Sequence, residues 1–290
     1  MGTRVAVVTG SNKGIGFAIV RALCSKFDGD VYLTARNEER GLAALKALEK
    51  EGLHPKFHLL DIESEDSIKS LATFLKSHYE GLDVLVNNAA IAYKNADTTP
   101  FGEQAENTIK INVLDTMNVC KILFPLLRPH ARVVNLSSSA GKLSQYVSSG
   151  ELQQKLKSET LTEDGLVKLM QQFVDDAKAG VNEQNGWGSR AYSISKIGVN
   201  ALTMIQHRNF LKDSRPDIVV NAVNPGRTYT DMNPSGTLTV DQDTDMTSHK
   251  GPLTPDQGAE APVYCALLPP NVESPRGEFI WNDKTIQSWH

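Results

Sequence analysis

The chain has 290 residues, of which 40% are hydrophobic and 22% charged, so it can bury a sizeable core and does not have the composition of a disordered chain. Its formal net charge of -4 gives no reason to expect nucleic acid or an anionic membrane as a partner. The first apolar run begins at Val5, which leaves no room for a secretory signal, and no run approaches the roughly 18 residues of a membrane span. We therefore expect a cytoplasmic protein.

Short runs rich in Val, Leu and Ile alternate with longer helical patterns, which is typical of a parallel sheet covered by helices on both faces. One helix is predicted from Ser64 to Tyr79, with a serine cap and an acidic first turn, and another from Glu103 to Phe124. We predict one α/β domain over residues 1–290, built on a doubly wound, seven-stranded parallel sheet. Its strands are Val5–Thr9, Val31–Ala35, Lys56–Asp61, Asp83–Asn87, Arg132–Ser137, Ile218–Asn224 and Glu278–Trp281.

Two segments interrupt this alternation. An insertion over about 144–187 contains its own predicted helix, with Thr162 as N-cap, an apolar stripe from Leu166 to Ala177, and Gly180 as the stop. The second segment, about 228–253, is rich in Thr, Asp, Gly and Ser without periodicity, and we expect a mobile loop there.

The three cysteines, Cys24, Cys120 and Cys265, lie far apart in apolar helical patterns. Their odd number and wide spacing indicate neither a disulfide framework nor a zinc site. We expect buried thiols and no bound metal.

A glycine-rich turn follows the first strand. Gly10, Gly14 and Gly16 allow a tight turn and a close approach to a pyrophosphate, whose charge is favoured at the N-terminus of the next helix. Glycine trios alone are weak signals, but the order of strand, turn and helix is that of a dinucleotide site. The predicted turn is Gly10-Ser-Asn12-Lys13-Gly14-Ile15-Gly16.

The second strand ends in Ala35-Arg36, where binders of NAD place an acid and binders of NADP place a cation. Lys13 in the glycine turn could reach the same 2′-phosphate from the other side. Both residues could also be ordinary surface cations. Two cations near one predicted phosphate, with no acid at that strand end, favour NADPH/NADP+.

Tyr192 and Lys196 are four residues apart, which places them on one face of a helix. Free tyrosine titrates near 10, so a tyrosine that gives up its proton at neutral pH needs a cation beside it. Such pairs also occur by chance on solvated helix faces. Polar residues follow four predicted strands and should line the same crevice, although turn chemistry alone explains any one of them. They are Asp61-Ile62, Asn87-Asn88, Ser137-Ser138-Ser139 and Asn224-Pro225-Gly226.

The combination of these motifs resembles the short-chain dehydrogenase/reductase superfamily over about residues 5–279. Lys13, Arg36, the long segment before Tyr192 and the run Leu267-Leu-Pro-Pro270 resemble more narrowly the monomeric NADPH-dependent carbonyl reductases of animals. The motifs, in chain order, are Thr9-Gly-x-x-x-Gly-Ile-Gly16, Asn87-Asn-Ala, Asn112, Ser138, Tyr192-x-x-x-Lys196 and Pro225-Gly226.

The resemblance implies a role for each matched residue. Tyr192 would be the general acid that protonates a carbonyl oxygen, Ser138 would donate a hydrogen bond to that oxygen, and Lys196 would lower the tyrosine pKa and bind ribose hydroxyls. Asn112 would hold a water for proton relay. The cofactor would be contacted by Asp61 and Ile62 at the adenine, Asn88 at the ribose, the Pro225-Gly226 turn and the backbone around Thr228 at the nicotinamide end, and Thr230 near the pyrophosphate.

The implied reaction is the NADPH-dependent reduction of aldehydes, ketones or quinones. Ala90, the pair Val223-Asn224 and Arg227 depart from the pattern of the vertebrate carbonyl reductases, and Arg227 places a cation near the mouth of the substrate site. A dedicated reductase of one endogenous ketone and a non-enzymatic NADPH sensor remain alternatives, of which the four catalytic-type residues disfavour the second. Because the predicted insertion helix needs an apolar surface to cover and its own chain offers the nearest one, we expect a monomer. The alternative is that this helix is itself the contact of a dimer.

Overall fold

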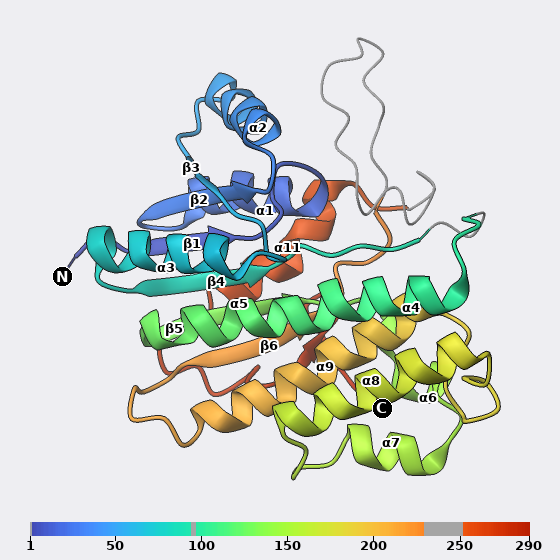
Figure 1. Ribbon diagram of the computed structural model, residues 1–290. Coiled ribbons are helices and arrows are strands. Elements are labelled where there is room, and N and C mark those ends of the chain that lie inside the picture. The colour runs from blue at the N-terminus through green and yellow to red at the C-terminus, as the bar shows by residue number, and fades with distance from the viewer. Residues whose placement is uncertain (1, 94–96, 229–251) are drawn as a thin grey trace.

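A twisted eight-stranded sheet with helices on both faces forms the centre of the molecule (Figure 1). This computed structural model describes residues 2–93, 97–228 and 252–290. The strand order is β3-β2-β1-β4-β5-β6-β7-β8. Successive strands are added outward from β1 to one edge of the sheet and then from β4 to the other edge. The strands are β1 Val5–Val8, β2 Asp30–Ala35, β3 Lys56–Leu59, β4 Leu82–Asn87, β5 Leu127–Leu136, β6 Val219–Val223, β7 Phe279–Ile280 and β8 Ile286–Gln287.

The predicted doubly wound α/β fold is confirmed, and β1 to β7 pair in parallel. The predicted count of seven strands omits β8, which pairs antiparallel with β7 at the edge of the sheet. Two exposed residues are too short a run to show strand periodicity in the sequence.

The apolar strands are buried on both faces because helices cover both sides. Val5 and Val7 of β1 pack in a cluster with α3 and α5, whereas Ala6 and Val8 pack in the opposite cluster with α1, α2 and α11. The helices are α1 Gly14–Lys26, α2 Glu38–Lys50, α3 Glu65–Tyr79, α4 Phe101–Ile109, α5 Thr116–Leu123, α6 Leu143–Tyr146, α7 Gly150–Leu156, α8 Glu163–Ala179, α9 Ala191–Phe210 and α11 Pro255–Ala266.

The helix predicted from Glu103 to Phe124 is interrupted. It begins at Phe101, changes to a π-helical segment over Lys110–Asp115, and continues as α5 to Leu123. Segments of this kind occur mostly as single turns inside α-helices and frequently at functional sites. Asn112 lies inside it.

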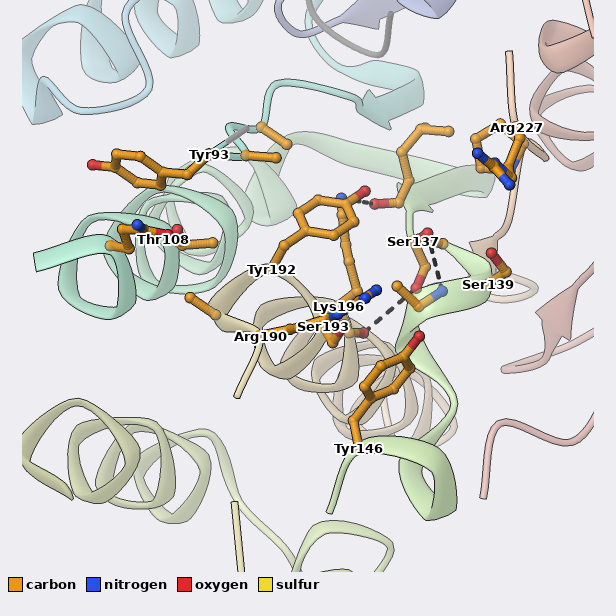
Figure 2. A pocket seen from close by; sticks show the side chains of 18 of the residues that line it. Tyr93, Thr108, Ser137, Ser139, Tyr146, Arg190, Tyr192, Ser193, Lys196 and Arg227 are labelled. Atoms are coloured by element: carbon orange, nitrogen blue, oxygen red, sulfur yellow. Dashed lines mark hydrogen bonds between the residues drawn. The ribbon is translucent and has the colours of Figure 1, made fainter. Parts of the chain in front are cut away.

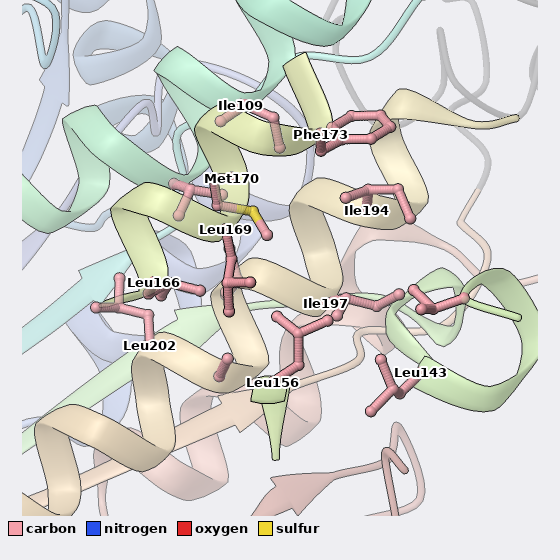
Figure 3. Packing of buried hydrophobic residues seen from close by; sticks show 14 of the residues in the cluster. Ile109, Leu143, Leu156, Leu166, Leu169, Met170, Phe173, Ile194, Ile197 and Leu202 are labelled. Atoms are coloured by element: carbon pink, nitrogen blue, oxygen red, sulfur yellow. The ribbon is translucent and has the colours of Figure 1, made fainter. Parts of the chain in front are cut away.

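The insertion adds three helices, α6, α7 and α8, of which α8 packs against both α4 and α9 (Figures 1 and 3). As predicted, the Thr162 side chain accepts a hydrogen bond from the Gly165 amide at the start of α8, and Gly180 ends the helix in the left-handed region. One cluster joins the buried stripe of α8 to residues of α4 and α9 such as Ile109 and Ile197. Its members on α8 are Leu166, Leu169, Met170, Phe173, Val174 and Ala177.

The ends of the predicted loop over 228–253 lie side by side, because Thr228 forms a bridge with Leu253 and the Leu253 amide donates to the Arg227 carbonyl. The interior of that loop is outside the described residues. All three cysteines are free thiols. Cys120 and Cys265 are buried as predicted, and Cys24 is only partly buried. None of the described helices combines the length and the apolar character needed to cross a membrane.

Candidate active site

A cavity of about 710 Å³ opens at the carboxyl ends of β4, β5 and β6, where ligands of open α/β sheets bind. It lies between α4, the start of α9 and the turn that follows β5 (Figure 2). Several predicted site residues line it together, drawn from segments far apart in the sequence. They are Asn88, Ser138, Tyr192, Lys196, Pro225, Gly226, Arg227 and Thr228.

Tyr192 and Lys196 occupy successive turns of one face of α9. The Lys196 side chain is buried, its Nζ donates a 2.7 Å hydrogen bond to the carbonyl of Leu136 on β5, and it lies 5.4 Å from the centre of the Tyr192 ring. The ring of Tyr192 faces the cavity, and the ammonium group lies behind it (Figure 2). A cation is therefore held against the phenol by the central strand.

The three serines in the turn after β5 make different hydrogen bonds. Ser137 is buried, and its Oγ donates to the carbonyl of Lys196 at 3.4 Å. The Ser138 Oγ accepts from the amide of Ala140 at 3.1 Å, which leaves its proton for an acceptor in the cavity. The Ser139 amide donates to the Oδ1 of Asn224, which fixes the turn from the side of β6.

Asn112 is buried and joins three segments. Its Oδ1 accepts from the amide of Ile91, and its Nδ2 donates to the Ile91 carbonyl and to the Oγ of Ser195. The side chain thus fixes the chain that follows β4 against α9. It does not line the cavity, and its predicted water-holding role stays a prediction.

The glycine turn has the backbone that a pyrophosphate site requires. Gly10 and Gly14 both have φ of +58°, a region that favours glycine, and a Cβ at Gly14 would meet no atom within 4 Å. A Cβ at Gly16 would lie 2.4 Å from the Nδ2 of Asn88. That amide donates to the carbonyls of Thr9 and Gly10, so the predicted ribose residue ties β4 to the turn.

Arg36 has a carboxylate partner that the sequence did not indicate. Its guanidinium lies 3.4 Å from the carboxylate of Glu63, which is also bonded to Lys110 at 3.0 Å. No acid stands at the end of β2 itself, but Glu63, which follows the neighbouring strand β3, competes for Arg36. Asp61 lies beside this pair and accepts from the Glu63 amide.

The other predicted cofactor residues lie near the same edge of the sheet. Asn12 and Lys13 lie in the turn before α1, Ile15 is buried in the first turn of α1, and Ile62 is buried just after β3. Thr230 lies outside the described residues.

The structure adds cavity residues that the sequence reasoning missed. Phe101, Gln104 and Thr108 line one wall, and the hydroxyl of Tyr93 accepts a 2.8 Å hydrogen bond from the Nδ2 of Asn107. The spacing of three and then four residues along α4 is the signal that could have placed Phe101, Gln104 and Thr108 on one face. Tyr146 on α6 and Arg190 at the start of α9 complete the opposite side (Figure 2).

The chain is similar over its whole length to proteins of known activity. The model of the short chain dehydrogenase family matches residues 4–150. The chain is 50% identical to carbonyl reductase [NADPH] 1 of Rattus norvegicus, covering 98% of each chain, and 49% identical to that of Homo sapiens, covering 99% of each. Among solved structures, salutaridine reductase of Papaver somniferum is similar with a TM-score of 0.81 and 32% identity, covering 95% of this chain and 99% of that one.

Proposed function

The chain belongs to the short-chain dehydrogenase family, and from this premise we propose that it catalyses the NADPH-dependent reduction of aldehydes, ketones or quinones to alcohols or hydroquinones. The observation that carries the proposal is the meeting of Tyr192, Lys196 and Ser138 at one cavity. Full-length relatives named carbonyl reductase [NADPH] support both the reaction and the cofactor.

The residues of the glycine turn fit a bound NADPH. The open left-handed turn at Gly14 and the N-terminus of α1 suit a pyrophosphate, and Lys13 and Arg36 would hold the 2′-phosphate. Asp61 and Ile62 would flank the adenine, and Pro225, Gly226 and Thr228 the nicotinamide end. When bound, NADPH supplies the hydride.

We assign the proton transfer to Tyr192. Its hydroxyl would protonate the carbonyl oxygen as that atom gains negative charge, while Ser138 donates a second hydrogen bond to the same oxygen. Lys196 would stabilise the phenolate that remains, because its ammonium group is already fixed against the ring by Leu136. Each of these side chains comes from an element anchored in the sheet or packed against it.

We also propose that the enzyme is a monomer of the cytoplasm. The buried stripe of α8 packs against α4 and α9 of its own chain, so these helices are covered. Three free thiols agree with a reducing compartment.

Steady-state rates with a panel of aldehydes, ketones and quinones test the activity. Each rate is measured as the loss of NADPH absorbance. We expect turnover of several members with NADPH and much less with NADH. A protein that binds NADPH and reduces no member of the panel would be a sensor rather than an enzyme. Turnover of a single ketone would identify a dedicated reductase.

A further inference from the structure

Two arginines from different elements line the rim of the cavity. Arg190 is the residue before α9, and Arg227 follows the Pro225-Gly226 turn after β6. Both side chains are exposed. In Figure 2, Arg227 lies above Ser139 at the upper right, and Arg190 lies below Tyr192 on the side formed by the start of α9.

Within the described parts of the chain, neither guanidinium has a carboxylate partner or a hydrogen-bond acceptor. Eight of the other nine arginines of the chain are bonded within these parts, and Arg40 is the exception. Those bonded to carboxylates are Arg4, Arg21, Arg36, Arg128, Arg132, Arg215 and Arg276, and Arg208 donates to the Leu161 carbonyl.

Among the described residues, the other charges that line the cavity do not neutralise these two groups. Lys196 adds a third cation, and the first turn of α9 adds the positive end of a 20-residue helix whose amides receive no side-chain cap. Asp97 is the one carboxylate among the described lining residues, and it accepts from the amide of Thr99. The described lining of the cavity therefore carries an excess of positive charge.

We infer that the part of the cavity lined by Arg190 and Arg227 is an anion subsite, in which each guanidinium attracts a negative group from its own side, and that the preferred substrates are carbonyl compounds that carry a carboxylate or a similar anionic group. The inference rests on the proposed reduction. A guanidinium binds a carboxylate through two parallel hydrogen bonds, which orient the ligand as well as attract it. An anion held at the rim would leave the carbonyl end of the same molecule to reach Tyr192 and Ser138.

The test compares 4-carboxybenzaldehyde with its methyl ester, two aldehydes that differ in one charge. For each, kcat/KM with NADPH and the dissociation constant from the full-length protein saturated with NADP+ are measured. We expect the native protein to favour the acid. Arg190→Gln and Arg227→Gln should each lower the acid-to-ester ratio about five- to tenfold, mainly through KM, as expected for an exposed charge-assisted bond. Added salt should lower the ratio of the native protein.

Lys155→Gln is the matched control, because Lys155 is an exposed cation of α7 outside the cavity, and its acid-to-ester ratio should equal that of the native protein. The inference is overturned if the protein binds acid and ester equally, or if neither arginine variant changes the acid-to-ester ratio of kcat/KM. In either case, turnover of the ester would still support the proposed reductase. If Arg227→Gln weakens NADPH binding and leaves the ratio unchanged, this arginine serves the cofactor and the subsite is wrong. Preferential, arginine-dependent binding of the acid without reduction of either aldehyde supports the subsite and contradicts the reductase.

Discussion

The Nζ of Lys196 lies 5.4 Å from the centre of the Tyr192 ring, and the same nitrogen donates to the carbonyl of Leu136. Helix α9 places the two residues one turn apart. The hydrogen bond to Leu136 on β5 then holds the long lysine side chain beside the ring. The cation is thus fixed in place by the protein itself, which is the kind of preorganisation that electrostatic catalysis requires.

Tyr192→Phe should lose most of the turnover, about 10²- to 10⁴-fold, because it removes the proposed proton donor and keeps the ring. NADPH binding should persist. Steady-state rates and a fluorescence titration with NADPH measure the two effects. Tyr146→Phe is the matched control, since Tyr146 lines the same cavity from α6 and has no proposed part in the chemistry. Near-normal turnover of Tyr192→Phe contradicts the assignment.

Lys196→Ala should impair both steps, because it removes the cation beside the ring and a proposed contact to the ribose. We expect lower turnover together with weaker NADPH binding, unlike Tyr192→Phe. A variant that loses turnover and binds NADPH normally would limit Lys196 to the chemistry.

Replacing Ala35 by Asp and Arg36 by Ser should shift the coenzyme preference from NADPH towards NADH. The new carboxylate suits a ribose hydroxyl, and the lost guanidinium would remove a charge-assisted bond to the 2′-phosphate, worth roughly 1.5 to 3 kcal/mol before solvent screening. The ratio of kcat/KM values for the two coenzymes measures the shift. An unchanged ratio would show that Arg36 is only a surface charge.

Glu63→Gln should raise the preference for NADPH severalfold. The Glu63 carboxylate is bonded to Arg36 and Lys110, so it competes with a phosphate for the guanidinium. Glu49→Gln on the exposed face of α2 serves as the control, because it removes the same charge away from Arg36. A fall in NADPH affinity would instead mean that Glu63 positions Arg36 for the phosphate.

His207 should make the fold less stable below neutral pH. Burial first, and the charge of Arg276 second, lower the pKa of His207 from 6.5 to about 4. Between these values the unfolded chain binds a proton that the folded protein does not, so stability present above pH ~6.5 is lost as the pH falls towards ~4. The loss is on the order of 3 kcal/mol.

Urea unfolding at neutral pH and near pH 5 measures this effect. His207→Gln should flatten the part of the pH dependence that His207 causes, whereas His54→Gln, at an exposed position, should keep it. An equal slope in the native protein and His207→Gln would show that other groups dominate.

Thr108→Val should leave the free energy of unfolding unchanged or raise it slightly. The Thr108 Oγ1 is buried without a hydrogen-bond partner among the described residues. Replacing this hydroxyl by a methyl group of the same shape therefore removes a desolvation penalty and breaks no hydrogen bond. Thr203→Val should lower stability by about 1 to 3 kcal/mol, because the Thr203 Oγ1 donates to Val199 and accepts from Asn135. Denaturation midpoints compare the two variants, and equal losses would contradict the prediction.

Local signals predicted much of this structure. The glycine turn, the caps of α8 and the strands β1 to β7 each follow from residues close together in the sequence, although strand ends shifted by a few residues. Within the π-helical turn, the hydrogen bonds of Asn112 to Ile91 and Ser195 join segments far apart in the sequence, which no local pattern reveals. The pairing of Arg36 with Glu63 likewise joins the ends of two neighbouring strands.

The apolar stripe of α8 should keep the protein monomeric. Met170 and Phe173 are fully buried against α4 and α9 of the same chain, so the surface of these helices is already covered (Figure 3). Burying a side chain of this size stabilises the folded state by roughly 1.5 to 3 kcal/mol. The contact therefore stabilises the fold of a single chain. Light scattering at micromolar concentration should give a mass near 31.7 kDa. Met170→Lys should lower the thermal stability of that monomer. A native mass near twice this value, converted to a stable monomer by Met170→Lys, would show that α8 is a dimer contact.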